Sequence, residues 1–271
     1  MSSHLANFRM QLIMSALSAQ GECRTSELAQ RFQLSENTIR RDLLELEERG
    51  LLLRVHGGAV LVDQDAAYAT RLEHSLPQKR AIGQAAATLI ESGQNIYLDV
   101  GSTTQELVRV IRDGLPTVTH LHIFTNGVKI AGELIGQTPY NVHLIGGEIY
   151  QNTFCTVGPS ALAQIDQFRF DLFFMGANGV DPQRGWTNSN HMEVLVKRAV
   201  ISRSKRVFAL VDSSKWNLPS LAQIVPLAGV KHWIVDADLA PDAQASARAA
   251  GVEVMIAAQG QSGPSYSATS P

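Results

Sequence analysis

The residues best placed to bind an anion lie in a short polar loop between a predicted strand and a predicted helix. An apolar run at 95–100 is followed by one glycine and three hydroxyl residues, Gly101, Ser102, Thr103 and Thr104. Glycine permits close backbone approach, and the hydroxyls converge with the first N–H groups of the helix, where the helix dipole favours negative charge. Helix capping is the plainer alternative. The position after a buried strand favours an anion site, because ligands of open α/β sheets bind at the carboxyl ends of strands.

Small or polar residues also follow several other predicted strands. The positions of interest on these loops are Thr125, Asn126, Gly146, Gly147, Asn178 and Lys215. For each loop taken alone, an ordinary turn is the alternative. Because the carboxyl ends of parallel strands share one edge of a sheet, the recurrence of such loops indicates the rim of a single pocket.

Glu193 and Lys197 stand four residues apart on a predicted helix, with the glutamate first. One interpretation is a surface ion pair that contributes about 0.2–0.5 kcal/mol. The other interpretation places both side chains at the mouth of the pocket, where they bind hydroxyls or a phosphate. The same two interpretations apply to Lys215. No metal or cofactor is predicted, because the cysteines and the later histidines show no ligand spacing. These residues are Cys23, Cys155, His120, His122, His143, His191 and His232.

A predicted helix from Ser35 to Arg49 carries a second kind of chemistry, and Ser35 is a suitable N-cap for it. Apolar residues at i, i+4 and i+7 predict a stripe that faces a core, formed by Ile39, Leu43 and Leu46. The opposite side carries Asn37, Arg40 and Arg41. Asparagine can pair with adenine and arginine with guanine, and arginine also binds phosphate. A solvated helix face is the alternative, and charge does not decide between them, since residues 1–60 contain seven arginines and seven acidic residues.

The segments on either side of this helix favour DNA binding. Thr25 is the predicted N-cap of a shorter preceding helix, and residues 33–34 form the turn between the two. After Gly50, two short apolar runs flank a Gly-Gly pair and predict a hairpin with Arg54 and His56 near its tip. A helix-turn-helix followed by such a hairpin is a winged helix, whose wing lies beside the DNA backbone or minor groove.

The elements that must position the pocket residues alternate along the rest of the chain. Short apolar runs separated by helical patterns are typical of a mostly parallel sheet with covering helices. The predicted strands cover 95–100, 121–125, 142–145, 172–176, 207–211, 232–236 and 252–256. The predicted helices cover 79–90, 104–112, 128–134 and 192–202.

Length and composition agree with a two-domain globular protein. The chain has 271 residues, 45% of them hydrophobic and 18% charged, and its net charge of -2 does not suggest a polyanion partner. We expect a winged helix-turn-helix at 1–61, a linker at 62–77, a Rossmann-like α/β sensor domain at 78–257 and a disordered tail at 258–271. No apolar run approaches the ~18 residues of a membrane span, and the first residues do not resemble a signal peptide, so the expected location is the cytoplasm.

Ser35–Leu43, Gly50-Leu51 and Arg54–Val60 together closely resemble the N-terminal signature of DeoR/GlpR-type bacterial transcriptional regulators. The loops of the predicted pocket are similar to the sensor half of that family, so the resemblance covers about residues 6–257. It implies a sensor domain that looks like ribose-5-phosphate isomerase and an effector that is a phosphorylated sugar. Two tryptophans, Trp186 and Trp216, stand where the family more often has leucine and phenylalanine. If either lines the pocket, the effector cannot be identified by analogy.

Residue pattern and resemblance together give two expected sites. The expected DNA-binding residues are Thr25, Ser35, Asn37, Thr38, Arg40, Arg41, Arg54 and His56. The expected effector-binding residues are Asp99, Gly101, Ser102, Thr103, Thr104, Thr125, Asn126, Gly146, Gly147, Asn178, Glu193, Lys197 and Lys215.

The resemblance implies a repressor of a carbohydrate-catabolism operon that its effector releases from double-stranded operator DNA. The alternative is a sugar-phosphate isomerase with an added DNA-binding module, in which Glu193 or Asp99 acts as the base. The winged helix argues against catalysis as the main task. Because bacterial operators usually pair two half-sites, we also expect a homodimer or homotetramer whose contacts come mainly from residues beyond Pro77.

Overall fold

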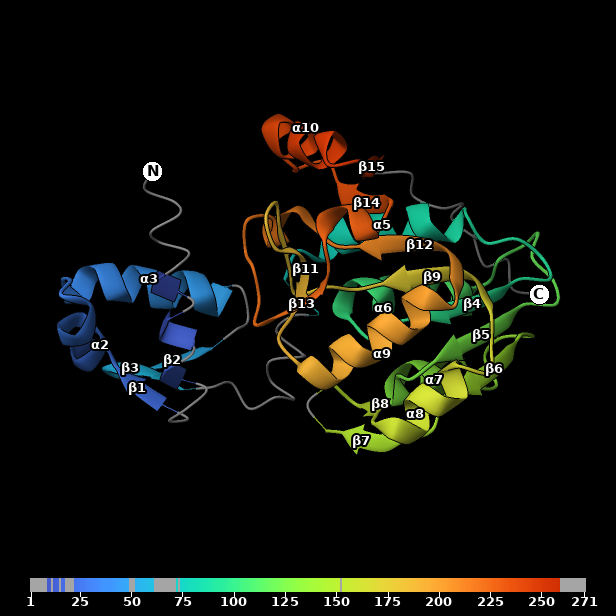
Figure 1. Ribbon diagram of the computed structural model, residues 1–271, viewed down its shortest axis with the longest axis horizontal. Coiled ribbons are helices and arrows are strands. Elements are labelled where there is room, and N and C mark those ends of the chain that lie inside the picture. The colour runs from blue at the N-terminus through green and yellow to red at the C-terminus, as the bar shows by residue number, and fades with distance from the viewer. Residues whose placement is uncertain are drawn as a thin grey trace, which may run out of the picture.

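The computed structural model describes residues 22–48, 52–60, 74–151 and 153–258, together with residues 9, 10, 12–14, 16, 17 and 72 (Figure 1). The described residues between 9 and 17 are helical. The predicted tail at 258–271 lies outside this part of the chain except for residue 258, and most of the predicted linker lies outside it as well. No helix within the described residues is long and apolar enough to cross a membrane.

The first elements form a winged helix. They are β1 (Glu22–Arg24), α2 (Thr25–Phe32), α3 (Glu36–Glu48), β2 (Leu53–Val55) and β3 (Gly58–Val60). Strand β3 lies between β1 and β2 and is antiparallel to both. The predicted hairpin is therefore present, with His56 and Gly57 as its turn, and Gly57 adopts a positive φ of 81°. Strand β1, which is only three residues long, was not predicted from the sequence.

A small apolar core holds this domain together. The predicted stripe on α3 is buried, with Ile39, Leu43 and Leu46 each no more than 1% exposed. Asp42, on the same helix, is also buried and accepts two hydrogen bonds from the Arg9 guanidinium, one of them 2.7 Å long. This ion pair ties the first helical residues to α3 and was not anticipated from the sequence.

The two predicted N-caps have different outcomes. The Thr38 N–H donates to the Ser35 hydroxyl at 3.3 Å, so Ser35 caps α3 as predicted. The prediction for Thr25 is wrong, because Arg24 is the N-cap of α2 and Thr25 is its first residue, 5% exposed. The backbone N–H of Thr25 instead donates to the carbonyl of Gly57 in the wing turn. Strand β1 leads directly into α2, and the helix therefore begins at Thr25, one residue earlier than predicted.

The second domain is built on a parallel sheet of seven strands (Figure 1). Its strands, in chain order, are β4 (Asn95–Leu98), β5 (His122–Thr125), β6 (Asn141–Leu144), β9 (Phe170–Met175), β12 (Ser204–Leu210), β14 (His232–Asp236) and β15 (Glu253–Ala257). Their order across the sheet is β15-β14-β12-β9-β4-β5-β6. Each strand overlaps one of the seven predicted strands. From β4 the chain adds β5 and β6 on one side. It then returns to the other side of β4 and adds β9, β12, β14 and β15 in that order.

Two layers of helices cover this sheet. The helices are α5 (Leu76–Ala87), α6 (Ser102–Asp113), α7 (Val128–Leu134), α8 (Pro159–Ile165), α9 (His191–Ser202) and α10 (Pro241–Ala249). Helices α5, α6 and α7 share a core with Ile96 and Leu98 of β4, whereas α8, α9 and α10 share a second core with Tyr97. Because neighbouring residues of a strand point to opposite faces, these two cores lie on opposite sides of the sheet.

Several elements of the second domain were not predicted. They are α8, α10, the hairpin of β7 (Glu148–Tyr150) and β8 (Cys155–Val157), the short helices η1 (Ser213–Lys215) and η2 (Leu227–Gly229), and a small antiparallel sheet of β10 (Gly179–Asp181), β11 (Gly185–Asn188) and β13 (Ala222–Val225). The linker prediction is also wrong at its end, since Pro77 belongs to the first turn of α5. Proline is favoured there because the first turn does not need its N–H.

Candidate functional site

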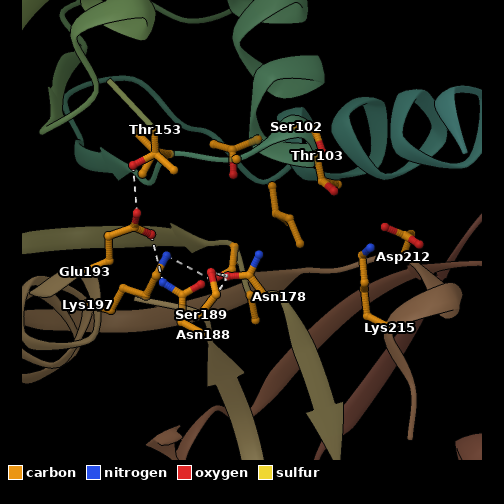
Figure 2. A pocket seen from close by; sticks show the side chains of 16 residues that line it. Ser102, Thr103, Thr153, Asn178, Asn188, Ser189, Glu193, Lys197, Asp212 and Lys215 are labelled. Carbon is orange, nitrogen blue, oxygen red and sulfur yellow. Dashed lines mark hydrogen bonds between the residues drawn. The ribbon is translucent and has the colours of Figure 1, made fainter. Parts of the chain in front are cut away.

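A pocket opens at the carboxyl ends of β4, β9 and β12. Strands β4 and β9 are neighbours at the point where the strand order reverses, which is where open α/β sheets form a crevice. Residues from these strand ends, from the β7–β8 hairpin, from β11 and from α9 surround it (Figure 2). They are Val100, Gly101, Ser102, Thr103, Thr104, Thr153, Gly176, Ala177, Asn178, Asn188, Ser189, Glu193, Lys197, Leu210, Asp212 and Lys215.

One wall of the pocket is the start of α6. Gly101 is the N-cap of this helix, and Ser102, Thr103 and Thr104 form its first turn and line the pocket. Thr103 is 7% exposed and Thr104 is fully buried. Among the described residues, the hydroxyl of Thr104 has no hydrogen-bond partner, although it is shielded from solvent. This wall therefore offers hydroxyl groups, free helical N–H groups and the positive end of a helix dipole.

The facing wall contains a buried ion pair between Lys197 of α9 and Asp99, at the end of β4. The same carboxylate accepts a hydrogen bond of 2.8 Å from the Gly176 N–H, and the ammonium also donates to the Gly176 carbonyl at 3.2 Å. Burial raises the pKa of Asp99, against the opposing effect of the Lys197 ammonium. Asp99 does not itself line the pocket, so its role is to hold Lys197 and the β9 loop in place.

Glu193 is a carboxylate held in a fixed position next to Lys197. Its two oxygens accept hydrogen bonds from the Thr153 hydroxyl at 2.7 Å and from the Asn188 amide at 2.8 Å. Its helix begins with Asn190, whose side chain accepts from two N–H groups of the first turn. Cys155 lies nearby and is buried, and burial with the Glu193 charge raises the pKa of this thiol to about 12. A thiol with such a pKa is not a nucleophile at neutral pH.

A second charged pair lies at the other end of the pocket, where Figure 2 shows Asp212 and Lys215 together. Both belong to the loop that follows β12 and contains η1. Burial opposes ionisation of Asp212, but the Lys215 ammonium, the Ser214 hydroxyl and the Lys79 ammonium together hold its pKa below the ordinary value. Asp212 is therefore an ionised carboxylate at neutral pH.

The structure brings most of the predicted effector residues together. Eight of them line the pocket, namely Gly101, Ser102, Thr103, Thr104, Asn178, Glu193, Lys197 and Lys215. Glu193 and Lys197 are buried, with 6% and 2% of their surface exposed, so they do not form a surface ion pair. Their spacing of four residues places them on the same side of α9, and this side faces the sheet.

Besides Asp99, four predicted residues do not line this pocket, and each has a visible structural role. The Thr125 hydroxyl accepts from the Gly127 N–H at 3.0 Å, and the Asn126 amide donates to the Thr156 carbonyl at 2.9 Å. The Gly146 N–H donates to Gln164. Gly147 has a φ of 152°, and a Cβ there would lie 2.6 Å from the Val157 carbonyl oxygen. These residues shape the turns after β5 and β6, whose ends lie on the far side of β4 from the rest of the pocket.

Six polar or small residues of the pocket were not predicted from the sequence, namely Thr153, Gly176, Ala177, Asn188, Ser189 and Asp212. Gly176, Ala177 and Asp212 stand at the ends of predicted strands, so the same signal of small or polar residues at a strand end was available for them. Thr153 lies between β7 and β8, Asn188 is the last residue of β11, and Ser189 follows it; the sequence pattern did not reveal these short strands. Neither tryptophan lines the pocket. Trp186 is buried and donates to the Leu227 carbonyl, and Trp216 stacks on Trp233.

The exposed side of α3 carries the expected DNA-contacting groups. Asn37, Arg40 and Arg41 are exposed, and Thr38 is partly exposed. The Arg40 guanidinium bonds to the Glu36 carboxylate at 2.6 Å and to the Asn37 side chain at 3.1 Å, and 57% of the arginine side chain remains exposed. These contacts hold the guanidinium close to Asn37.

The wing carries the other two candidates. The Arg54 guanidinium pairs with the Glu47 carboxylate at 2.7 Å, and the Arg54 N–H donates to the same side chain at 2.8 Å. This pairing fastens the wing to α3, with 41% of the arginine side chain exposed. His56 is exposed in the turn. Thr25 is buried, which makes it a support of the wing turn rather than an exposed contact residue.

Comparisons with known proteins give both halves of the chain a family. Residues 9–65 match the model of the DeoR-like helix-turn-helix domain, and residues 74–237 match the DeoR C-terminal sensor domain. The chain is 35% identical over 233 residues to the HTH-type transcriptional regulator FruR of Bacillus subtilis, covering 85% of this chain and 91% of that protein. It is 30% identical over 227 residues to the glycerol-3-phosphate regulon repressor of Escherichia coli, covering 83% and 88%.

A solved ribose-5-phosphate isomerase in complex with phospho-erythronic acid is more distant. It is 18% identical, superposes with a TM-score of 0.39, and the alignment covers 52% of this chain and 53% of the isomerase. A superposition at this level supports no conclusion about function. Both domain matches and the similar full-length relatives instead identify a DNA-binding regulator rather than an enzyme. The chain belongs to the DeoR family of HTH-type transcriptional regulators.

Proposed function

We propose that the protein represses a carbohydrate-catabolism operon, and that a phosphorylated sugar or related phosphate ester in the pocket releases it from its operator. The observation that carries the proposal is the composition of the pocket. The hydroxyl-rich first turn of α6 faces two lysines and a fixed carboxylate across one cavity. The relative from Escherichia coli bears the name of a phosphate ester, which supports the same class of effector.

The phosphate group is assigned to the start of α6. Ser102, Thr103 and Thr104 supply hydroxyls next to free N–H groups, and Lys215 supplies positive charge from the loop after β12. Lys197 is buried in its pair with Asp99, whereas Lys215 is partly exposed, so Lys215 is the more accessible partner for an added anion.

The sugar hydroxyls are assigned to the end of the pocket that contains Glu193. This carboxylate keeps acceptor capacity beside its bonds to Thr153 and Asn188, and Asn178 adds an amide. Hydroxyl groups donate to carboxylates and exchange hydrogen bonds with amides, which suits a polyol chain. The pocket thus combines an anion subsite with a subsite that binds hydroxyl groups, as a phosphate ester of a sugar requires.

Operator binding is assigned to α3 and the wing. Asn37, Arg40 and Arg41 are proposed to enter the major groove, with Arg54 and His56 beside the backbone or minor groove. Ser35 and Thr38, at the start of the helix, are proposed to contact phosphate. We also propose a homodimer or homotetramer, because one winged helix reads only a short half-site.

A thermal-shift screen of the full-length protein against phosphorylated sugars and polyol phosphates tests the effector assignment, with the unphosphorylated sugars as controls. A ligand at 100 times its dissociation constant should add about 2.7 kcal/mol to the free energy of unfolding. Calorimetry on Thr103→Val should then show roughly a tenfold or greater loss of affinity, since a hydrogen bond to a charged group contributes about 1.5–3 kcal/mol. Equal stabilisation by the unphosphorylated sugars would contradict a phosphate subsite.

A further inference from the structure

The loop that supplies Lys215 to the pocket is also connected to the start of α5, the first helix after the segment that joins the two domains. Asp212, the other charged residue of this loop, is 2% exposed and ionised, and Lys215 and Ser214 lie next to it. A carboxylate buried to this degree requires compensating positive charge. Lys215 comes from the pocket side, and a second ammonium comes from α5.

That second ammonium is Lys79, which is 2% exposed although it is a lysine near the start of a helix. Its charge contributes to the low pKa of Asp212. Its Nζ also donates to the backbone carbonyl of His74 at 2.6 Å. Lys79 therefore interacts electrostatically with the Asp212 carboxylate of the pocket and bonds to the last residues before α5.

A series of hydrogen bonds makes a second connection between the pocket loop and α5, separate from the contacts of Lys79. Ser213 donates through its N–H and its hydroxyl, both at 2.7 Å, to Asp236 at the end of β14. The same Asp236 carboxylate accepts from the Asp238 N–H at 3.1 Å, and the Asp238 carboxylate accepts from the Gln78 amide at 2.9 Å. Asp236 is fully buried, whereas the bond between Gln78 and Asp238 lies at the surface. The pocket loop is thus linked to two adjacent residues of α5, Gln78 and Lys79.

The junction at which both connections end has an unusual backbone. Ser75, the N-cap of α5, has a φ of 52°, in the left-handed region that non-glycine residues rarely adopt. Its hydroxyl bonds to the His74 ring at 2.9 Å, and its carbonyl accepts from the Lys79 N–H at 3.0 Å. Conformations of this kind persist only where the surroundings hold them. A change in the contacts of Lys79 therefore acts on a junction whose backbone conformation depends on those contacts.

We propose that the Asp212–Lys215 loop transmits effector binding from the pocket to the start of α5, and through it to the DNA-binding domain. The proposal rests on the proposed function and adds the route by which effector binding in the pocket reaches the DNA-binding domain. An anion beside Lys215 draws that ammonium away from Asp212. The carboxylate then attracts Lys79 more strongly, and the bond from Lys79 to the His74 carbonyl weakens. Release of that carbonyl loosens the turn that precedes α5.

Hydrogen–deuterium exchange on the full-length protein tests this route, with inorganic phosphate as the probe and calorimetry to establish that it binds. Allosteric coupling usually amounts to a factor of about 5–150. Saturating phosphate should accordingly speed exchange of the amides at 78–80 by at least about fivefold. The variants Lys79→Met and Asp238→Ala, alone and combined, remove one connection each, because Asp238→Ala takes away the acceptor of the Gln78 amide, and both leave the pocket side chains in place. They should still bind phosphate in calorimetry and lose the response at 78–80.

Arg80→Met is the matched control, because Arg80 is the next residue of α5 and 61% of its side chain is exposed. It should keep both the affinity and the exchange response. If the wild type does not bind phosphate, the effector assignment falls and the route falls with it. If phosphate binds and exchange at 78–80 does not change, the effector assignment stands and the route is refuted. A full response in the double variant would equally refute the two connections named above.

Discussion

The most informative substitution in the pocket is Thr104→Val, because it should change stability and effector affinity in opposite directions. Thr104 is fully buried, and its hydroxyl has no hydrogen-bond partner within the described part of the chain. A Cβ built at Gly101 or at Gly176 would lie 3.8 Å from this oxygen. The hydroxyl therefore lies next to a glycine of each of two pocket loops.

The effect on the empty protein follows from the cost of an unpaired buried hydroxyl. That cost is about 1–3 kcal/mol, and valine has nearly the same shape without the polar atom. The free energy of unfolding of Thr104→Val should therefore rise by about 1–3 kcal/mol. For a domain of this size each kcal/mol raises the melting temperature by roughly 2–4 °C.

The effect on effector binding has the opposite sign. If the Thr104 hydroxyl is left unpaired so that a phosphate oxygen can use it, valine removes a hydrogen bond to a charged group. Such a bond contributes about 1.5–3 kcal/mol, which corresponds to a loss of affinity of roughly 10- to 150-fold. Differential scanning calorimetry and isothermal titration with the effector found in the screen measure the two effects on one sample.

Thr125→Val is the matched control at the end of the neighbouring strand. Thr125 is as buried as Thr104, but its hydroxyl accepts from the Gly127 N–H and it does not line the pocket. The substitution should lower stability by about 1–3 kcal/mol, because that N–H loses its acceptor, and should leave effector affinity unchanged. A destabilised Thr104→Val with normal affinity would refute the reasoning, since the hydroxyl would then be serving the fold.

Three further outcomes are expected. Arg40→Ala and Arg41→Ala should each weaken operator binding, measured by fluorescence anisotropy, without unfolding the protein. Loss of a guanine contact should cost about 1–3 kcal/mol of binding free energy and relax specificity at one base pair. Loss of a phosphate contact should instead flatten the salt dependence of binding. Wild-type affinity in both would contradict the recognition-helix assignment. Lys197→Met should destabilise the protein by about 3–5 kcal/mol in urea titrations, because Asp99 loses its partner. This loss should shrink as the pH falls, because a carboxylate whose pKa burial raises then takes a proton; a pH-independent loss would contradict the buried pair. Light scattering at micromolar concentration should show a dimer or tetramer, and a monomer alone would contradict the half-site argument.

The regular elements of this protein could be predicted from local pattern. The stripe of Ile39, Leu43 and Leu46 and the cap at Ser35 predict the core face and the start of α3. The seven apolar runs predict all seven strands of the large sheet. Such predictions succeed because burial of one face imposes a period of about 3.6 on helices, and burial of both faces makes parallel strands apolar throughout. The elements that escaped are mainly short strands of three or four residues, such as β1, β10 and β11, which are too brief to show a period.

The hydroxyl loop at 101–104 was also visible in the sequence, because it depends only on a strand that leads into a helix. Which of the other strand-end loops share its pocket was decided by strand order alone. Strand β4 lies between β9 and β5, and the pocket opens on the β9 side, so Gly176 and Asp212 face it whereas Thr125 and Gly147 do not. The positions of Thr153 and Asn188 against Glu193 likewise depend on a hairpin and a small sheet that pack above the strand ends. Local pattern determines which elements form, because it reflects the burial of each segment. The contents of the site depend on contacts between residues far apart in the chain, and only the tertiary structure determines those.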